Sequence, residues 1–313
     1  MSKVVYIASA GHSGSTLLDM IIGSIPRVFS TGEVKYLPWQ LNLRGRTEAN
    51  VENLNVCSCL KKFSECEVWS KIVEELNKKV GFNIHKKPYK FNLSILSSQI
   101  LGKKLRISTR GARFIFSRCL NFPFYEIIVK LYKFCYRRIV KNNWLLFDTI
   151  CDLCDVDYIV DSTKDYNRFK LLYSERPDDV YLIVLKRDFF GYAYSHLKRD
   201  VQLKESLEQQ KKTYDNIMKV AKHTKGLKYL FIEYEKLCEN PIEQRKRTAN
   251  FLNLPNPGNE LHINTQNYHI VAGNPMRYKG KITIRLDERW KEKFDEDQKE
   301  NIRLIKRAIY KEV

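Results

Sequence analysis

Several features that mark other protein classes are missing from this chain of 313 residues. It has no run of about 18 apolar residues, so we expect no membrane-spanning helix. Its first residues lead directly into an apolar run, with Lys3 before it and no secretory signal pattern. We therefore expect a cytoplasmic protein whose eight cysteines are mostly reduced. We also see no internal repeat and no low-complexity tail.

Acidic residues are scarce relative to basic ones. The chain has 36 Asp and Glu against 55 Lys and Arg, a formal net charge of +19. The basic residues are spread along the chain, which favours a general attraction for anions over a single nucleic-acid patch. We therefore expect no nucleic-acid partner.

The most informative segment is Ala10 to Asp19, which follows the apolar run Val4 to Ala8 and precedes an amphipathic run. This order is typical of a strand, a tight loop and a helix. Its small and hydroxyl residues would lie where a helix N-terminus presents free N–H groups: Gly11, Ser13, Gly14, Ser15 and Thr16. Backbone donors, hydroxyls and the positive end of the helix dipole together bind phosphate.

One residue of the familiar nucleotide loop is absent. That loop reads G-x-x-x-x-G-K-[ST], whereas Ser15 follows Gly14 here, so the lysine that would reach a γ-phosphate is missing. This disfavours an ATPase or kinase of that class, for which Asp161 is the one candidate Walker-B acid.

A second candidate phosphate site follows the apolar run Val180 to Leu185, which is typical of a buried parallel strand. Arg187 would then lie at the carboxyl edge of the sheet, where open α/β folds bind ligands. Ser195 comes eight residues later, about two helical turns. The two side chains could contact one phosphate from two sides.

With both segments considered together, the chain resembles the sulfotransferases that use 3′-phosphoadenosine 5′-phosphosulfate (PAPS). His12 to Thr16 matches the family's K/R/H-[ST]-G-[ST]-T core, and Arg187 with Ser195 matches its arginine–serine spacing. His269 to Arg277 is similar to the late H-x-[IV]-x-G-N-P-x-R segment of the bacterial-type branch. The resemblance implies transfer from PAPS to a hydroxyl or amine, with Gly11 to Thr16 at the 5′-phosphosulfate and Arg187 and Ser195 at the 3′-phosphate.

The resemblance also suggests catalytic residues. His12, where the family usually has lysine or arginine, is the candidate donor to the leaving phosphate. Glu33 is the candidate base, with His85 and His196 as alternatives. Lys164 is expected near the sulfate, and Arg277 and Lys279 are expected to close over the 3′-phosphate.

Three thiols lie close together in the sequence, at Cys57, Cys59 and Cys66, ahead of Trp69. They could bind zinc with a fourth ligand from elsewhere. Because the sequence shows no full set of four ligands, loop packing or a disulfide is the favoured interpretation, and no metal is expected.

We expect an α/β, P-loop-like three-layer fold, in which a central parallel sheet is flanked by helices. Residues 1–313 should form a single domain, with a basic helical insertion at about 67–142 covering the acceptor site. The amphipathic stretch 124–140 suggests peripheral membrane contact, although packing on the sheet is favoured. The acceptor is expected to be a small molecule, carbohydrate or lipid. A P-loop kinase and a non-enzymatic basic protein that binds anions or nucleic acid are the alternatives.

Overall fold

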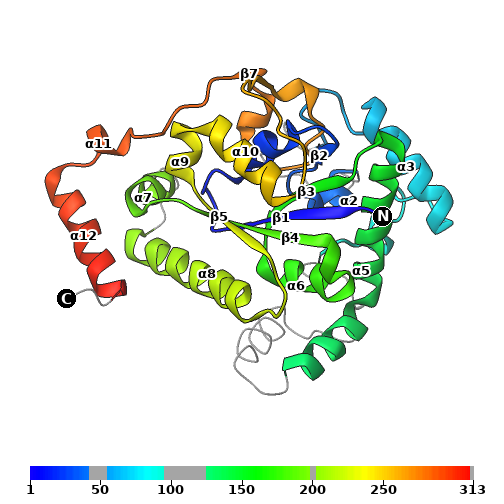
Figure 1. Cartoon of the computed structure of the whole chain (residues 1–313), viewed down its shortest axis with the longest axis horizontal. Coiled ribbons are helices and arrows are strands. Elements are labelled where there is room, and N and C mark those ends of the chain that lie inside the picture. The colour runs from blue at the N-terminus through cyan, green and yellow to red at the C-terminus, as the bar shows by residue number, and fades with distance from the viewer. Residues whose placement is uncertain (42–54, 95–124, 198–201, 311–313) are drawn as a thin grey trace.

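The centre of the protein is a sheet of five parallel strands in the order β2-β3-β1-β4-β5 (Figure 1). The computed structural model describes residues 1–41, 55–94, 125–197 and 202–310. The five strands are β1 (Lys3–Ser9), β2 (Val28–Ser30), β3 (Tyr158–Lys164), β4 (Val180–Lys186) and β5 (Tyr229–Glu233).

Strand β1 lies between β3 and β4 and is buried on both faces. Val4 and Tyr6 belong to the apolar core on one side of the sheet, whereas Val5 and Ile7 belong to the core on the other. Successive side chains of a strand point to opposite faces, so the continuous apolar sequence of β1 serves two layers of helices. The predicted three-layer α/β class is therefore confirmed.

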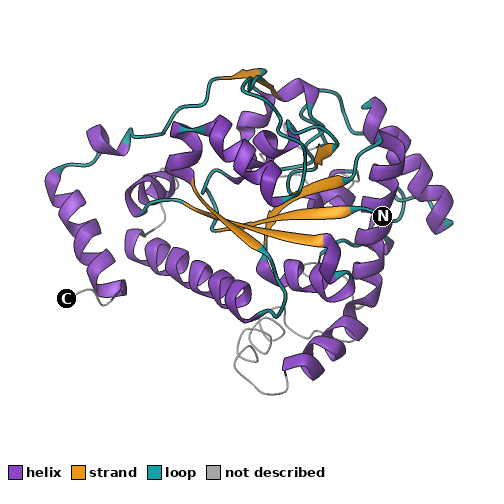
Figure 2. Cartoon of the chain, viewed as in Figure 1, coloured by secondary structure: helices purple, strands orange, loops and turns teal. Residues whose placement is uncertain are grey.

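Helices cover both faces of the sheet (Figure 2). The layer that packs on Val5 and Ile7 contains α1 (Ser15–Gly23), α9 (Tyr234–Glu239) and α10 (Pro241–Phe251). The layer that packs on Val4 and Tyr6 contains α3 (Glu67–Val80), α5 (Tyr125–Cys154), α6 (Tyr166–Glu175) and α8 (Leu203–His223). The remaining α-helices and strands of the described residues are α2 (Leu37–Gln40), α7 (Phe189–Leu197), β6 (Ile263–Asn264), β7 (Lys281–Ile282), α11 (Trp290–Lys293) and α12 (Glu296–Tyr310).

The C-terminal helix α12 packs beside α7 and α8, at the opposite side of the molecule from the N-terminus (Figure 1). Ile302 of α12 and Phe294 join a third apolar cluster with Tyr192 and Tyr214. This cluster anchors the chain that follows β7, so residues 283–289 are held over the carboxyl end of the sheet.

The strands expected at Val4 to Ala8 and Val180 to Leu185 are present as β1 and β4, and the helix expected after the first loop is present as α1. Two helices, α7 and α8, follow β4, and the short helix α9 follows β5. Most of residues 255–285 is irregular, but this stretch contains the small antiparallel pair β6–β7.

The central part of the expected insertion, residues 95–124, lies outside the described residues. Helix α5 buries Val140, Trp144 and Phe147 in the core, so this portion of the helix packs on the sheet. Membrane contact through the earlier part of α5 stays a prediction. Within the described ranges, no helix has both the length and the apolar character needed to cross a bilayer.

Candidate functional site

A cleft of about 910 Å³ opens at the carboxyl ends of β1, β3 and β4. Ligands of open α/β sheets bind at this edge, where the strand order reverses direction. Nine of the twelve residues predicted for the site line the cleft: Gly11, His12, Gly14, Ser15, Thr16, Glu33, Lys164, Arg187 and Ser195.

The loop between β1 and α1 is the candidate phosphate loop. Two of its residues have a left-handed backbone conformation, His12 at φ 58° and Gly14 at φ 86°. Gly14 is required for a second reason, since a Cβ there would lie 2.3 Å from Cδ2 of Tyr234. The aromatic ring thus presses directly on the loop, and only glycine fits both the backbone conformation and the space.

The turn leaves the N-terminus of α1 facing the cleft. Gly14 is the N-cap and provides no side-chain cap, and the first turn holds no acidic residue. The first amides of a helix have no intrahelical partner, so this end offers donors and a positive dipole to an anion. The Thr16 hydroxyl was expected at the phosphate. In the structure its Oγ1 also accepts a hydrogen bond of 3.0 Å from the Asn274 amide.

Ser13 points away from the cleft. It is fully buried, and its Oγ lies 3.2 Å from the hydroxyl of Tyr214. That hydroxyl donates to the Leu185 carbonyl at 2.7 Å and accepts from the Arg187 amide at 3.3 Å. Tyr214, which sequence reasoning missed, therefore fastens the phosphate loop to the end of β4.

Arg187 and Ser195 meet as their spacing predicts. Nη1 of Arg187 donates to Ser195 Oγ at 3.0 Å and to the His12 carbonyl at 3.0 Å. The guanidinium also lies over the Tyr234 ring, 4.5 Å from its centroid. The second candidate site is therefore joined to the phosphate loop by a direct hydrogen bond.

The buried guanidinium of Arg187 is not fully satisfied. Its Nε and Nη2 have no hydrogen-bond partner among the described residues, although Asp287 Oδ2 lies 3.7 Å from Nη2. The Arg187 side chain is only 7% exposed. Leaving buried donors unpaired is costly, so an anion that accepted from both nitrogens would be strongly favoured here.

Glu33 and Lys164 form an ion pair at another wall of the cleft. They meet because they follow neighbouring parallel strands, Glu33 after β2 and Lys164 at the end of β3. The turn at Gly32, with φ 69°, is fixed by Asp19 of α1, whose Oδ2 accepts from the Gly32 amide at 3.1 Å. Burial raises the pKa of Asp19 to about 7.

Lys35 is a cleft residue that sequence reasoning missed. Burial lowers the pKa of its ammonium, and the nearby Asp165 carboxylate offsets part of this shift. A lysine held in a poorly solvated wall makes strong electrostatic contacts with any anion that reaches it.

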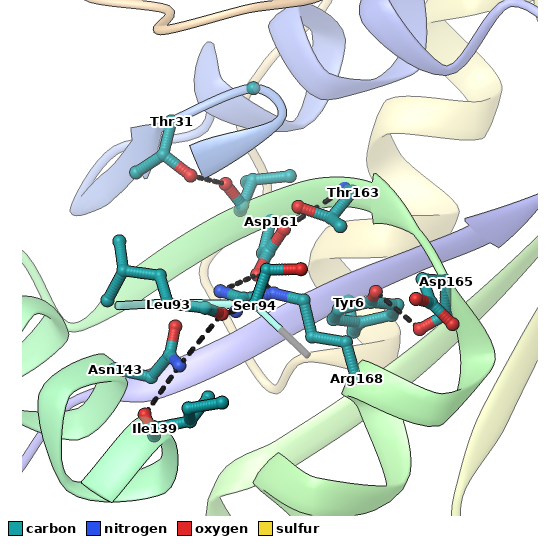
Figure 3. Close-up of polar contacts among 12 residues, drawn as sticks. Tyr6, Thr31, Leu93, Ser94, Ile139, Asn143, Asp161, Thr163, Asp165 and Arg168 are labelled. Carbon is teal, nitrogen blue, oxygen red and sulfur yellow. Dashed lines mark hydrogen bonds and ion pairs between the residues drawn. The ribbon is translucent and has the colours of Figure 1, made fainter. Parts of the chain in front are cut away.

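A buried polar network joins β3 and α6 to the segment at Leu93 (Figure 3). Arg168 donates from Nε and Nη2 to Asp161 Oδ2 at 2.9 and 2.8 Å, and from Nη1 to the Leu93 carbonyl. The Asp161 carboxylate also accepts from the Thr163 amide at 3.0 Å. Asp161 thus forms a buried ion pair with Arg168 and does not line the cleft. Since it was the candidate Walker-B acid, this weakens the kinase alternative.

The late segment approaches the cleft with residues other than those predicted. Arg277 does not line the cleft; it is 4% exposed and donates to the carbonyls of Ile270 and Val271 at 3.1 and 2.8 Å. Lys279 is also outside the lining. Arg285 and Arg289 line it instead, and they lie in a loop where no periodicity marks them. The binding roles assigned to Arg277 and Lys279 stay predictions.

The three candidate histidines are placed differently. His12 lines the cleft, and its ring centroid is 5.2 Å from that of His196. His196 in turn stacks on Tyr192, with ring centroids 4.4 Å apart, and does not line the cleft. His85 lies elsewhere, with Nδ1 3.2 Å from the Leu41 carbonyl, so of the proposed bases only Glu33 lines the cleft.

No protein-family model matches the chain, and no curated protein sequence matches it. Among solved structures it is similar to the sulfotransferase domain from the curacin biosynthetic pathway, at 15% identity over 99% of this chain and 98% of that one, with a TM-score of 0.47. It is also similar to the sulfotransferase domain of the Synechococcus PCC 7002 olefin synthase, at 16% identity over 98% and 95%, TM-score 0.47. Sulfotransferase STF9 from Mycobacterium avium shares 10% identity over 81% and 64%, TM-score 0.42.

Proposed function

We propose that this chain is a sulfotransferase that moves a sulfuryl group from PAPS to a hydroxyl or amine of a small molecule, carbohydrate or lipid. The observation that carries the proposal is the pairing of two anion sites in one cleft. Nη1 of Arg187 is bonded to both Ser195 and the phosphate loop, while Nε and Nη2 have no hydrogen-bond partner among the described residues. A nucleotide with phosphates at both its 5′ and 3′ positions satisfies both sites.

Residues of the loop would hold the 5′ end of the donor. The amides at the start of α1 supply hydrogen-bond donors, and the helix dipole supplies partial positive charge. Arg187 and Ser195 would hold the 3′-phosphate. The loop also brings His12 to the cleft, where its imidazole can donate to the oxygen that leaves.

Glu33 would take the proton of the acceptor. Its carboxylate lines the cleft, and its ion pair with Lys164 fixes its orientation. Lys164 and Lys35 place positive charge at the same wall, where negative charge builds on the group in transfer. PAPS supplies the activated sulfuryl group, and the protein supplies positioning and electrostatic stabilisation.

The first test is ligand binding, with adenosine 3′,5′-bisphosphate (PAP), AMP, ATP and an oligonucleotide compared by thermal shift. A ligand at about 100 times its dissociation constant adds about 2.7 kcal/mol to the free energy of unfolding. PAP should stabilise the protein most, and AMP much less. Stabilisation by ATP or oligonucleotide with no effect of PAP would contradict the proposal.

The second test is catalytic. PAPS labelled in its sulfuryl group is incubated with the protein and a panel of sugars, phenols, lipids and peptides, and labelled product is counted. We expect transfer to at least one hydroxyl or amine class. If the protein binds PAP but transfers to no acceptor, and does not hydrolyse PAPS even slowly, it is a binding module and not an enzyme.

A further inference from the structure

Four side chains able to bind a metal converge outside the cleft. Cys57, Cys59, Cys66 and His269 place one ligand atom each so that all four atoms lie within 4.8 Å of one another. Nδ1 of His269 is 3.6 Å from Sγ of Cys57 and 3.3 Å from Sγ of Cys66. His269 is 203 residues from Cys66 along the chain, so the sequence pattern alone could not show a complete set of ligands.

These distances match a tetrahedral zinc site. Zinc bonds are about 2.3 Å long to sulfur and about 2.0–2.1 Å to nitrogen. In a tetrahedral site these lengths place two sulfur ligands about 3.8 Å apart, and a sulfur and a nitrogen ligand about 3.5 Å apart. The distances from His269 Nδ1 to the two sulfurs, 3.6 and 3.3 Å, lie on either side of this sulfur–nitrogen value. Three thiolates and one imidazole form a common structural zinc set, in which no position remains open for substrate.

The backbone around the four ligands is held as such a site requires. Ser58, between two of the cysteines, donates from Oγ to the Tyr268 carbonyl at 2.6 Å and accepts from the Ile270 amide at 2.9 Å. Trp69 Nε1 donates to the His269 carbonyl at 2.7 Å. The residues on both sides of the histidine are thus fastened to the cysteine loop, and the ligands are positioned before any metal binds.

A disulfide explains the cluster less well. All three cysteines are free thiols in the structure, and a bond between any two would leave the third thiol and His269 without a role. Cys57 and Cys66 are buried, and Cys59 is half-buried, so a metal bound among them would be largely shielded from water. Packing alone would not require an imidazole nitrogen to face two thiols.

We propose that Cys57, Cys59, Cys66 and His269 bind one structural zinc ion. The ion would join the cysteine loop and the start of α3 to the segment after β6. That segment reaches the candidate site within five residues, since the Glu33 amide donates to the Ala272 carbonyl at 3.0 Å and the Asn274 amide donates to Thr16. The zinc would therefore support the wall of the cleft without touching a ligand in it.

The direct test is the metal content of the full chain, purified under reducing conditions without added metal and dialysed against buffer free of metal. Elemental mass spectrometry should find about one zinc per chain. Cys59→Ser and His269→Ala should each lower that content at least severalfold, whereas Cys154→Ser, in a half-buried thiol of α5 outside the cluster, should leave it unchanged. Folded wild-type protein without stoichiometric zinc would count against the proposal.

A second measurement does not depend on the variants remaining folded. Wild-type protein is depleted of metal with a chelator, shown to be reduced by thiol counting, and titrated with Co²⁺. Saturation at one equivalent, with a thiolate charge-transfer band and the intense visible bands of tetrahedral cobalt, is expected. A spectrum without thiolate ligation, or a Cys57–Cys66 disulfide in freshly purified protein, would overturn the proposal. Both readouts are independent of sulfotransferase activity.

Discussion

Glu33 and Lys164 pair across the ends of two neighbouring strands, and each remains partly open to the cleft, with side-chain exposures of 17% and 19%. Residues 131 apart in the chain meet because β2 and β3 are parallel and in register, from Val28 beside Tyr158 to Ser30 beside Val160. The pair therefore has a fixed place relative to the loop between β1 and α1, and for this reason the proposal gives Glu33 the role of base.

Replacing Glu33 tests its role as the base. Glu33→Gln keeps the shape of the side chain but cannot accept a proton, so kcat for transfer from PAPS should fall by about 10²–10⁴-fold, the usual contribution of general base catalysis. PAP affinity should change little, because the proposal assigns nucleotide binding to the loop before α1 and to Arg187. Steady-state kinetics and calorimetry with PAP separate the two effects.

The matched control is Glu239→Gln, at the exposed end of α9. It makes the same chemical change away from the cleft and should leave kcat unaltered. Wild-type turnover by Glu33→Gln would remove Glu33 from the mechanism.

The Arg187 site should distinguish nucleotides by their 3′-phosphate. Arg187→Gln removes hydrogen bonds to a charged group, and the loss of even one, at about 1.5–3 kcal/mol, lowers affinity about 10–150-fold, so PAP affinity should fall by at least about tenfold. AMP, which lacks the 3′-phosphate, should lose much less. Ser195→Ala removes the hydroxyl that accepts from Arg187 Nη1, and the loss of one such contact, at about 0.5–1.5 kcal/mol, should weaken PAP binding by about three- to tenfold.

Calorimetric titrations with both nucleotides decide the origin of the effect. Arg187 also donates to the His12 carbonyl, so its loss could disturb the phosphate loop. In that case PAP and AMP affinities would fall equally, and the assignment of Arg187 to the 3′-phosphate would be wrong.

Sequence patterns located the parts of the site that depend on local spacing. The loop at Gly11 to Thr16 and the interval from Arg187 to Ser195 are fixed by one strand, one turn and one helix, so a short stretch of chain determines their geometry. Glu33 and Lys164 were expected at the site from the family resemblance, and they meet because neighbouring parallel strands end at a common edge of the sheet.

Contacts between distant segments could not be predicted in this way. Arg277 lies in a motif-like segment but is held inward by carbonyls of its own segment, whereas Arg285 and Arg289 reach the cleft from irregular chain. His269 joins the cysteines only after the chain folds back over α1. Such positions are set by tertiary packing, which leaves no periodic signal in the sequence.

Gly14 should tolerate no side chain. Gly14→Ala places a Cβ within 2.3 Å of the Tyr234 ring at a φ of 86°, so it combines overpacking with backbone strain. We expect the free energy of unfolding to fall by about 1–3 kcal/mol, and PAP affinity to fall with the distortion of the loop. Urea denaturation and calorimetry measure the two effects.

Gly11→Ala provides the comparison, because a Cβ at Gly11 meets no atom within 4 Å. Its effect on stability should be much smaller, although both glycines belong to the same loop. Equal stability of Gly14→Ala and the wild type would mean that Tyr234 does not press on the loop in solution.

Asp19 should make stability depend on pH. Burial raises its pKa to about 7 in the folded protein, above the value of about 3.9 for an unfolded chain. Between these values the folded state holds a proton that the unfolded state has released. The free energy of unfolding should therefore fall as the pH rises from about 4 to about 7, by at most about 1.4 kcal/mol per pH unit, and level off above that range.

The variant Asp19→Asn isolates this contribution. Its amide oxygen can still accept from the Gly32 amide, but the side chain has no proton to lose, so the decline of stability over about pH 5–7 should be shallower than in the wild type. Asp178→Asn, at an exposed carboxylate, should keep the wild-type slope. Urea denaturation at a series of pH values gives the slopes. Identical slopes for Asp19→Asn and the wild type would mean that Asp19 ionises at its ordinary pKa, and that water reaches the carboxylate which holds the turn before Glu33.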